Sequence, residues 1–393
     1  MVSKDTKRML IMNASSNIIF NYIGIFVNLY LWEKNKSIFD VAWFNLVMFV
    51  SWTVCFVVGA RLISRYSNRI LLRCIALCGA AIFTLLSVLE LDNRMLWIAV
   101  IAVPVGAMWG SYAIAQNITL SMLGRGKDFE SYFSLASING QAISIVNPIV
   151  FALVIRWIGY AGSFLLMFVF VTILMAVSFF IPRVSLADAP EPLFRGLSLR
   201  RVYAASSLRW MVPSCLAAGF FLQFQGLFAL IFTFSVSQDK LVIALLNVLY
   251  ATSAIGAMIL YRKARLSAGI WLAVGMAAVS VGFLAALLQH APFLVLSNIL
   301  TTVGMFYFAT VWNTQQFSMI TKYTPIEQAR IFIWREMFLN VTRIILLGLV
   351  LPLTSLSGPW FITLLLAALA CAGSVPYFVS RSAAALAKEA DAS

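Results

Sequence analysis

Long apolar runs, separated by short polar or charged breaks, extend along the whole chain. Each run has roughly the 20 residues or more that a helix needs to cross the hydrocarbon core of a bilayer. The runs lack the two-residue alternation of barrel strands, and a helix satisfies its own backbone hydrogen bonds in lipid. The pattern therefore predicts an all-α integral membrane protein with twelve transmembrane helices, which cover 10–32, 40–63, 70–90, 95–122, 132–155, 159–181, 209–236, 241–261, 268–288, 292–320, 331–353 and 357–380.

The composition leaves no room for a sizeable soluble domain, because 62% of the residues are hydrophobic and only 11% are charged. The start of the chain is basic, like the first part of a signal peptide. However, the first apolar run contains Asn13, Asn17 and Asn21 and no small-residue cleavage site. We expect this run to be retained as the first transmembrane helix, so the chemistry of the protein takes place in or beside the bilayer.

The net charge of +14 is distributed unevenly between the two sides of the predicted membrane. If the N-terminus is cytoplasmic, most Lys and Arg residues fall in cytoplasmic breaks, and the opposite side keeps only Lys34, Lys36, Arg94, Arg156 and Lys240. This asymmetry is the positive-inside pattern of multi-pass proteins. It predicts a protein of the cell membrane with both termini in the cytoplasm, in contact with membrane lipids, and it argues against a nucleic-acid partner.

The cysteines give no sign of a disulfide framework or a metal site. All five lie inside predicted helices, at Cys55, Cys74, Cys78, Cys215 and Cys371. Cys74 and Cys78 share a helix face, but the single histidine, His290, lies in a distant turn. The polar segments also lack a nucleophile–base arrangement, a phosphate-binding glycine loop and metal-ligand spacing. We therefore expect neither an enzyme nor a protein that carries a metal or another cofactor.

The widest polar break divides the predicted helices into two sets of six. We expect an N-terminal half at 1–181, a cytoplasmic central loop at 182–208, and a C-terminal half at 209–393 that ends in a short cytoplasmic tail. Within the loop, Leu197–Tyr203 is a candidate amphipathic helix on the membrane surface. Positions offset by 197 residues match in the two halves: Gly59 with Gly256, Arg65 with Arg262, and Gln116 with Asn313. This fixed offset indicates an internal duplication.

A basic turn, Ala60–Arg69, follows the second predicted helix and carries Leu62, Arg65 and Arg69. Together with the six-plus-six arrangement and the long central loop, this turn resembles the major facilitator superfamily of secondary transporters, where the turn reads roughly Gly-x-Leu-x-Asp-Arg-x-Gly-Arg-Arg. Ser64 stands where that family has its aspartate. The resemblance extends over nearly the whole chain and implies two pseudo-symmetric six-helix bundles around a central cavity. It also implies a cytoplasmic gate that includes Arg65, Arg69 and Arg262.

Polar residues inside the predicted helices mark the candidate lining of that cavity. Four asparagines, spaced by four, four and seven residues, lie on one face of the first helix: Asn13, Asn17, Asn21 and Asn28. An alternative is that such groups bond across helix interfaces, where each contributes about 0.6 kcal/mol. The candidate substrate contacts of this kind are Asn17, Asn21, Trp109, Tyr112, Gln116, Gln141, Tyr307 and Asn313, with Phe224 and Trp312 added for an apolar part of the substrate. Gly106 and Gly110 form a GxxxG pair that predicts close helix packing.

The predicted helix at 331–353 carries charges at membrane depth, where each costs at least about 2.5 kcal/mol. Glu336, Asn340 and Arg343 share one face of this helix, whereas Arg335 points about a quarter turn away. With a rise of about 1.5 Å per residue, Arg343 lies about 18 Å above the start of the helix, close to the midplane.

An arginine at this depth suits a carboxylate or phosphate, so Arg343 and Asn340 are candidate substrate contacts. Glu336 is a candidate proton-coupling residue, because a carboxyl group at this depth can carry a proton. Its alternative role is to neutralise Arg335, Arg343 or a cation of a cytoplasmic loop.

These features predict a secondary active transporter that moves a small organic anion, or an amphipathic molecule with an anionic group, by alternating access. Its partners would be this small-molecule substrate and the membrane lipids, and we expect a monomer. Two alternatives fit the same pattern. One is a lipid or lysolipid flippase on the same fold, and the other is a receptor or scaffold in the membrane that transports nothing.

Overall fold

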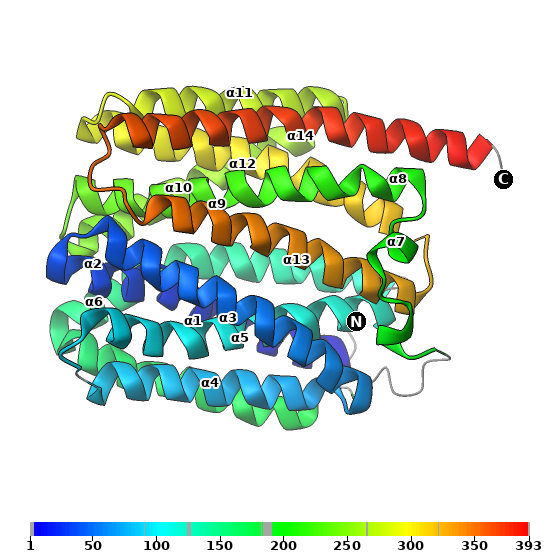
Figure 1. Cartoon of the computed structure of the whole chain (residues 1–393). Helices are drawn as coiled ribbons and strands as arrows, with labels where there is room; N and C mark the ends of the chain where they lie inside the picture. The colour runs from blue at the N-terminus through cyan, green and yellow to red at the C-terminus, as the bar shows by residue number, and fades with distance from the viewer. Residues whose placement is uncertain are drawn as a thin grey trace. The chain divides into compact units, whose positions relative to one another are not determined.

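The computed structural model describes residues 4–89, 91–123, 127–181, 183, 191–264, 266–320 and 322–391, and every regular element in these ranges is a helix (Figure 1). The longer helices are α1 (Lys4–Tyr22), α2 (Asn28–Asn35), α3 (Ile38–Arg65), α4 (Asn68–Val88), α5 (Arg94–Leu123), α6 (Lys127–Phe180), α9 (Met211–Val236), α10 (Lys240–Lys263), α11 (Ala268–Ala286), α12 (Ala291–Ile320), α13 (Pro325–Val350) and α14 (Pro359–Asp391). The short ones are the π-helix η1 (Ile23–Val27), the 3₁₀-helix η2 (Leu193–Gly196), α7 (Leu199–Val202) and α8 (Ser206–Arg209).

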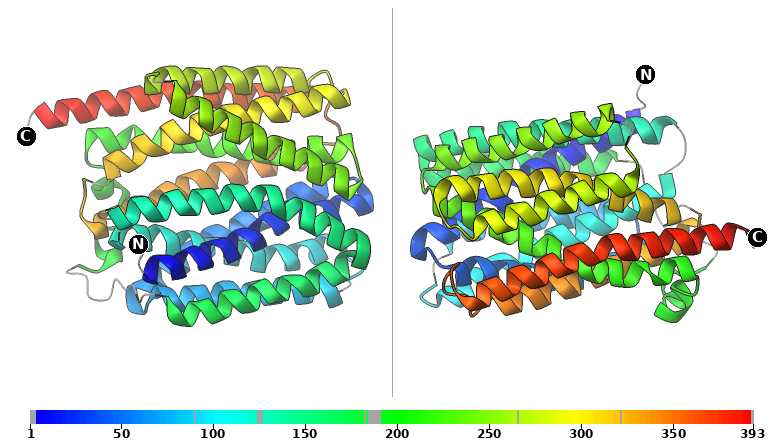
Figure 2. Two further views of the ribbon diagram at one scale, coloured as in Figure 1. Left: turned by 180° about the vertical axis from the view of Figure 1, so that it is seen from behind. Right: turned by 90° about the horizontal axis from the view of Figure 1, so that it is seen from above.

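Ten helices in the described part of the chain are long and apolar enough to cross a membrane, which makes the chain a multi-pass membrane protein. One of them is α6, where two spans were predicted. Gly159 interrupts α6 with φ of 71° and ψ of −179°, a region essentially restricted to glycine. The two arms of α6 run in opposite directions from that point (Figure 2). Helix α13 is not among the ten, and its 26 residues include the charged side chains of Arg335, Glu336 and Arg343.

The backbone divides into two compact units, each with its own apolar core. The first unit comprises Met1–Lys36, Trp43–Leu197 and Pro325–Ile333, and the second comprises Ser37–Ala42, Ser198–Thr324 and Trp334–Ser393. Large side chains that are fully buried in the first unit are Tyr22, Phe26, Phe83, Phe151 and Phe164. Their counterparts in the second unit are Phe221, Phe224, Phe228, Phe234 and Phe283.

Close packing of α5 on α3 in the first unit depends on glycine. A Cβ on Gly110 would lie 2.5 Å from the carbonyl oxygen of Trp52, and a Cβ on Gly106 would overlap the carbonyl oxygen of Met48. The backbones of the two helices therefore touch, which confirms the packing predicted from the GxxxG pair. Around this contact, α4 packs on α5 and α6, and α1 packs on α6.

The same device joins α11 to α12 in the second unit. A Cβ on Gly304 would lie 2.5 Å from the carbonyl oxygen of Gly275, and a Cβ on Gly275 would lie 2.9 Å from that of Gly304. On α9, Gly219 faces Leu339 and Thr342 of α13. This contact holds the charged helix against α9, while α14 packs on α8, α9, α11 and α12.

Within the first unit, the described end of the central loop is fixed to the start of α13. Arg330 is only 4% exposed, and its guanidinium donates to the carbonyl oxygens of Leu193 and Pro192, each at 3.0 Å. It also forms an ion pair with Glu191 at 3.1 Å. Gly196 lies directly on the guanidinium, since a Cβ there would be 2.5 Å from the central carbon of Arg330.

The predicted surface helix at Leu197–Tyr203 forms a single turn, α7. Tyr203, at the end of this turn, is only 5% exposed, and its ring packs edge to face on Phe338 of α13 with centroids 5.8 Å apart. Helix α13 covers the ring of Tyr203, and the position of this segment at the membrane surface stays a prediction. Residues 182 and 184–190 of the predicted loop lie outside the described residues.

The C-terminal end of α14 caps the N-terminus of α8 in the second unit. The Glu389 carboxylate accepts from the backbone N–H of Ser207 at 3.0 Å and from the hydroxyls of Ser206 and Ser207 at 2.9 and 2.7 Å. The first N–H groups of a helix have no partner inside the helix, and a carboxylate at this position satisfies one of them. Glu389 therefore acts as a helix cap supplied by a distant part of the sequence.

We expect Glu389→Ala to lower the free energy of unfolding by about 0.5–2 kcal/mol, the usual cost of losing a helix cap. Glu389→Gln should lose less, because the amide oxygen still accepts a hydrogen bond. Thermal unfolding of the purified protein, followed by tryptophan fluorescence, measures both effects. The control is Lys388→Ala at the exposed neighbouring position. An equal loss in Glu389→Ala and Lys388→Ala would contradict the capping role.

Candidate functional site

The asparagines of the first helix point toward other helices of the first unit. Asn13 donates to the hydroxyl of Tyr112 on α5 at 2.9 Å, and Asn17 donates to Asn13 Oδ1 at 3.0 Å. Further along α1, Asn21 Oδ1 accepts from Asn147 of α6 at 2.8 Å. The predicted polar face thus forms short hydrogen-bonded chains between helices, and three of the predicted contacts, Asn17, Asn21 and Tyr112, belong to them.

Asn28 follows the π-helix η1 and stabilises it. Its side-chain amide donates to the carbonyl oxygens of Gly24 at 3.1 Å and Ile23 at 3.3 Å, and its Oδ1 accepts from Asn45 of α3 at 3.2 Å. A π-helix disturbs the regular backbone pairing of the helices on either side, and the amide supplies a donor to the carbonyls concerned. With 3% of its surface exposed, Asn28 is a structural member of the polar face.

The remaining predicted contacts of the first unit are neutral as well. Trp109 stacks on Phe20 with ring centroids 3.8 Å apart, and on Trp52 with centroids 5.4 Å apart. Gln116 on α5 and Gln141 on α6 are half-buried. Aromatic rings and amides can hold an uncharged part of a ligand, but they do not balance a formal charge.

The three arginines of the predicted cytoplasmic gate lie at helix ends. Arg69, near the start of α4, donates through Nε to the carbonyl oxygen of Ile181 at 2.8 Å and so ties α4 to the end of α6. Arg65 and Arg262 are exposed in the last turns of α3 and α10. The gate itself stays a prediction.

Helix α13 supplies the charged groups of the candidate site. Glu336 and Asn340 are buried, with 7% and 1% of their surface exposed. Arg343 Nη1 lies 3.7 Å from Glu336 Oε1 and donates to Asn340 Oδ1 at 3.0 Å. The three residues predicted to share a face are therefore in contact, as an ion pair with an amide beside it.

Arg335 turns toward α12 and is the site residue that the sequence argument missed. Its Nε donates to Gln316 Oε1 at 2.5 Å, and its Nη2 donates to Asn313 Oδ1 at 3.0 Å. The guanidinium carbon lies 4.9 Å from the ring centre of Trp312, a cation–π distance. Arg335 thus brings the predicted contact Asn313 and the aromatic Trp312 to the charged helix. Its charge inside a predicted membrane helix, the same signal that selected Arg343, was available in the sequence.

Two other predicted contacts belong to the packed interior of the second unit. Tyr307 is 2% exposed, and its ring lies 4.5 Å from that of Trp271 on α11, centroid to centroid. Phe224 packs on Phe228 and Phe361 with centroids 4.5 and 6.2 Å apart. In the part of the chain that the structure describes, neither residue contacts the charged side chains of α13.

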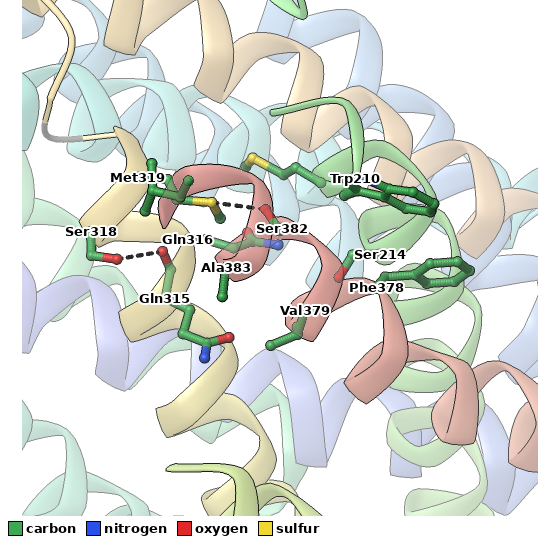
Figure 3. A pocket seen from close by; sticks show the side chains of 12 residues that line it. Trp210, Ser214, Gln315, Gln316, Ser318, Met319, Phe378, Val379, Ser382 and Ala383 are labelled. Atoms are coloured by element: carbon green, nitrogen blue, oxygen red, sulfur yellow. Dashed lines mark hydrogen bonds between the residues drawn. The ribbon is translucent and has the colours of Figure 1, made fainter. Parts of the chain in front are cut away.

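A small cavity of about 50 Å³ lies between α9, α12 and α14 (Figure 3). Gln316, the acceptor of Arg335, contributes to its wall, and Ser214 beside it accepts from the Trp312 indole at 2.9 Å. Ser382 closes one side by donating to the carbonyl oxygen of Ser207 at 2.6 Å. The space holds a few water molecules at most. It is therefore too small for a metabolite.

Comparison with known proteins gives matches among solved structures only: no protein-family model and no curated protein matches the chain. A POT family transporter in complex with 5-aminolevulinic acid aligns with a TM-score of 0.71 and 12% identity over 96% of each chain. The POT family transporter PepTSo aligns with a TM-score of 0.70 and 10% identity over 99% of this chain and 98% of that one. The nucleoside transporter NupG aligns with a TM-score of 0.62 and 14% identity over 98% and 99%.

The matched proteins are secondary transporters with the major facilitator fold, and the alignments extend over nearly the whole of both chains. At such low sequence identity, the likeness concerns the fold. The chain therefore has the major facilitator fold.

Proposed function

We propose that this chain is a secondary active transporter that works by alternating access. The fold of the matched transporters supports this proposal, and so does the buried ion pair between Glu336 and Arg343 on α13. Charges at membrane depth are expensive and serve substrate or ion pathways in most membrane proteins. The ten apolar spans become twelve if the two arms of α6 and the charged helix α13 are each counted as one crossing, and they would form two six-helix halves.

The proposed substrate is a small organic anion or an amphipathic molecule with an anionic group. The charged side chains of the α13 cluster are Arg335, Glu336 and Arg343, so the cluster carries one positive charge in excess. An anionic group on the substrate would balance that excess, and arginine suits a planar carboxylate or a phosphate. Neutral side chains of the same unit, such as Asn313 and Asn340, would contact the rest of the molecule.

Glu336 is the proposed proton-coupling residue. While Glu336 is ionised, it holds Arg343 in an ion pair at 3.7 Å. Protonation would remove this partner and leave the guanidinium to the substrate anion, so proton and substrate would bind together. By exchanging Glu336 for the substrate anion, Arg343 would couple proton binding to substrate binding.

The protein is proposed to act as a monomer in the cell membrane, with both termini in the cytoplasm. The excess of Lys and Arg in alternate breaks supports that orientation. Arg65, Arg69 and Arg262 would then lie on the cytoplasmic side, where the resemblance to the superfamily assigns a gate.

Measuring the binding and the flux of acidic, neutral and cationic metabolites tests this proposal. A ligand at 100 times its Kd stabilises the folded state by about 2.7 kcal/mol, which thermal unfolding detects. We expect acids to stabilise the wild-type protein and to enter proteoliposomes, and Arg343→Ala to lose both effects. Arg343→Gln serves as a second variant, because it retains a hydrogen-bond donor toward Asn340.

Arg200→Ala is the matched control, since it removes the same charge from an exposed position on α7. It should keep both binding and flux. Stabilisation by cations alone would overturn the anion assignment. Binding of acids without flux would overturn transport and would favour a receptor.

A further inference from the structure

The charges of α13 are not balanced within the cluster. Glu336 is paired with Arg343, whereas the partners of Arg335 are the amide oxygens of Gln316 and Asn313 and the ring of Trp312. Among the residues that the structure describes, no carboxylate lies within ion-pair distance of Arg335. A half-buried guanidinium keeps its charge, and a charge removed from water requires a counter-charge. The excess positive charge of the cluster is therefore located on Arg335.

The hydrogen bonds of Arg335 leave a defined set of donors. A guanidinium has five N–H groups in one plane, and here Nε and Nη2 each donate once, to Gln316 and Asn313. The two N–H groups of Nη1 and the second one of Nη2 remain. The outer edge between Nη1 and Nη2 is the fork that binds a carboxylate or phosphate through two parallel hydrogen bonds. The two amides fix the plane of this fork before any ligand arrives.

Tyr203 provides a second, independent observation. Its hydroxyl is buried and has no hydrogen-bond partner among the described residues. Burial raises the pKa of this phenol well above its usual range, and the Arg335 charge acts on the same group in the opposite direction. The hydroxyl is therefore a protonated donor. The Tyr203 ring packs on Phe338, three residues after Arg335 on α13, which places Tyr203 against the turn of the helix that carries Arg335. A buried hydroxyl without a partner is costly, and such groups are rare in folded proteins.

We propose that Arg335 and Tyr203 form the docking point for the anionic group of the substrate. The fork of Arg335 binds two oxygens of a carboxylate or phosphate monoester, and the Tyr203 hydroxyl donates to one of them. This docking point adds to the contact that the proposed function assigns to Arg343, whose pairing with Glu336 responds to protons. This assignment rests on the proposed function, since it names the residues that hold the anion of the transported molecule.

Binding of two probe anions to the purified full chain tests the assignment. Benzoate and phenyl phosphate are the probes, benzyl alcohol is the uncharged comparison, and calorimetric titration gives Kd. We expect both acids to bind the wild-type protein and benzyl alcohol to bind weakly. Tyr203→Phe should weaken the acids about tenfold or more, because it removes a hydrogen bond to a charged group. Arg335→Lys should weaken them at least as much, because lysine has no bidentate fork.

Stability without ligand separates a binding role from a structural one. Tyr203→Phe removes a hydroxyl that makes no hydrogen bond to any residue that the structure describes, so the ligand-free protein should keep or raise its unfolding temperature while it loses affinity. Tyr250→Phe is the matched control, because the Tyr250 hydroxyl accepts from Asn298 at 3.2 Å. It should lose stability and keep the affinity for both acids. Arg381→Lys controls for the arginine change, since Arg381 also lies over a ring, that of Tyr377 at 5.2 Å.

Unchanged Kd values in Tyr203→Phe and Arg335→Lys would overturn the docking point, as would a wild-type protein that binds neither acid. This failure differs from failure of the proposed function. If acids are transported but bind these two variants normally, only the docking point is wrong. If acids bind in the predicted way but no flux is found, the docking point stands and the transport function fails.

Discussion

Replacing Gly106 by valine is expected to prevent the first unit from folding. A Cβ at this position would overlap the carbonyl oxygen of Met48 and would lie 2.7 and 2.9 Å from Ser51 Cβ and the Trp52 nitrogen. Two of these atoms are backbone, so no change of rotamer relieves the contact, and α5 would have to move away from α3. We expect a loss of more than about 3 kcal/mol, beyond the usual cost of an overpacked core.

Detergent-solubilised protein, separated by size and followed by its tryptophan fluorescence, measures this effect. Gly106→Ala should show a smaller loss of the folded, monodisperse fraction, because it adds a single methyl group. Gly373→Val is the control, since a Cβ on this exposed residue of α14 meets no atom within 4 Å. If Gly106→Val yields as much folded protein as Gly373→Val, the close contact between α3 and α5 is incorrect.

The second large effect is expected for Glu336→Ala. Glu336 is buried against Arg343, with Nη1 and Oε1 3.7 Å apart. Removing the carboxylate leaves an arginine charge without this counter-ion inside the membrane domain. Breaking a buried pair in this way costs about 3–5 kcal/mol, which is a large part of the stability of most domains.

The double variant Glu336→Ala/Arg343→Ala separates charge from packing. It should be more stable than Glu336→Ala alone, because neither charge is left behind. Glu336→Gln has the same shape as the native residue, so its stability should lie between those of Glu336→Ala and the double variant. Equal unfolding temperatures for Glu336→Ala and the wild-type protein would show that the pair contributes nothing to stability.

Much of the fold could be predicted from the sequence, because membrane helices are marked by length and apolarity alone. The predicted run at 268–288 corresponds to α11, Ala268–Ala286, and the run at 292–320 corresponds to α12, Ala291–Ile320. The glycine pair at 106 and 110 predicted a close helix contact, since small residues spaced by four lie on one face. The partner helix, α3, could not be identified in this way, because spacing contains no information about neighbours.

The candidate site was predicted less well, for the same reason. The common face of Glu336, Asn340 and Arg343 follows from helix geometry and is present in the structure. Arg335 lies off that face, and only the presence of α12 beside it shows that its side chain reaches Asn313. Tyr307 precedes Asn313 by six residues, about 600° of helix rotation, so the two side chains could have been assigned to different sides of α12 from the sequence.

Tyr203 illustrates a different limit. A short segment with basic residues and an aromatic ring is typical of a membrane-surface helix, and the sequence favoured that interpretation. The ring is buried because Phe338 of α13 covers it, and these two residues are far apart in the chain. Burial of a single side chain in a loop depends on such long-range contacts, which periodicity does not report.

The cap that Glu389 places on α8 has a consequence for the order in which the chain is made. Ser206 and Glu389 are 183 positions apart. At about 5–20 residues per second, synthesis takes on the order of 10–40 s to connect the two. During that interval the start of α8 lacks the carboxylate that caps it. The second unit therefore completes this part of its hydrogen bonding only after α14 has been synthesised.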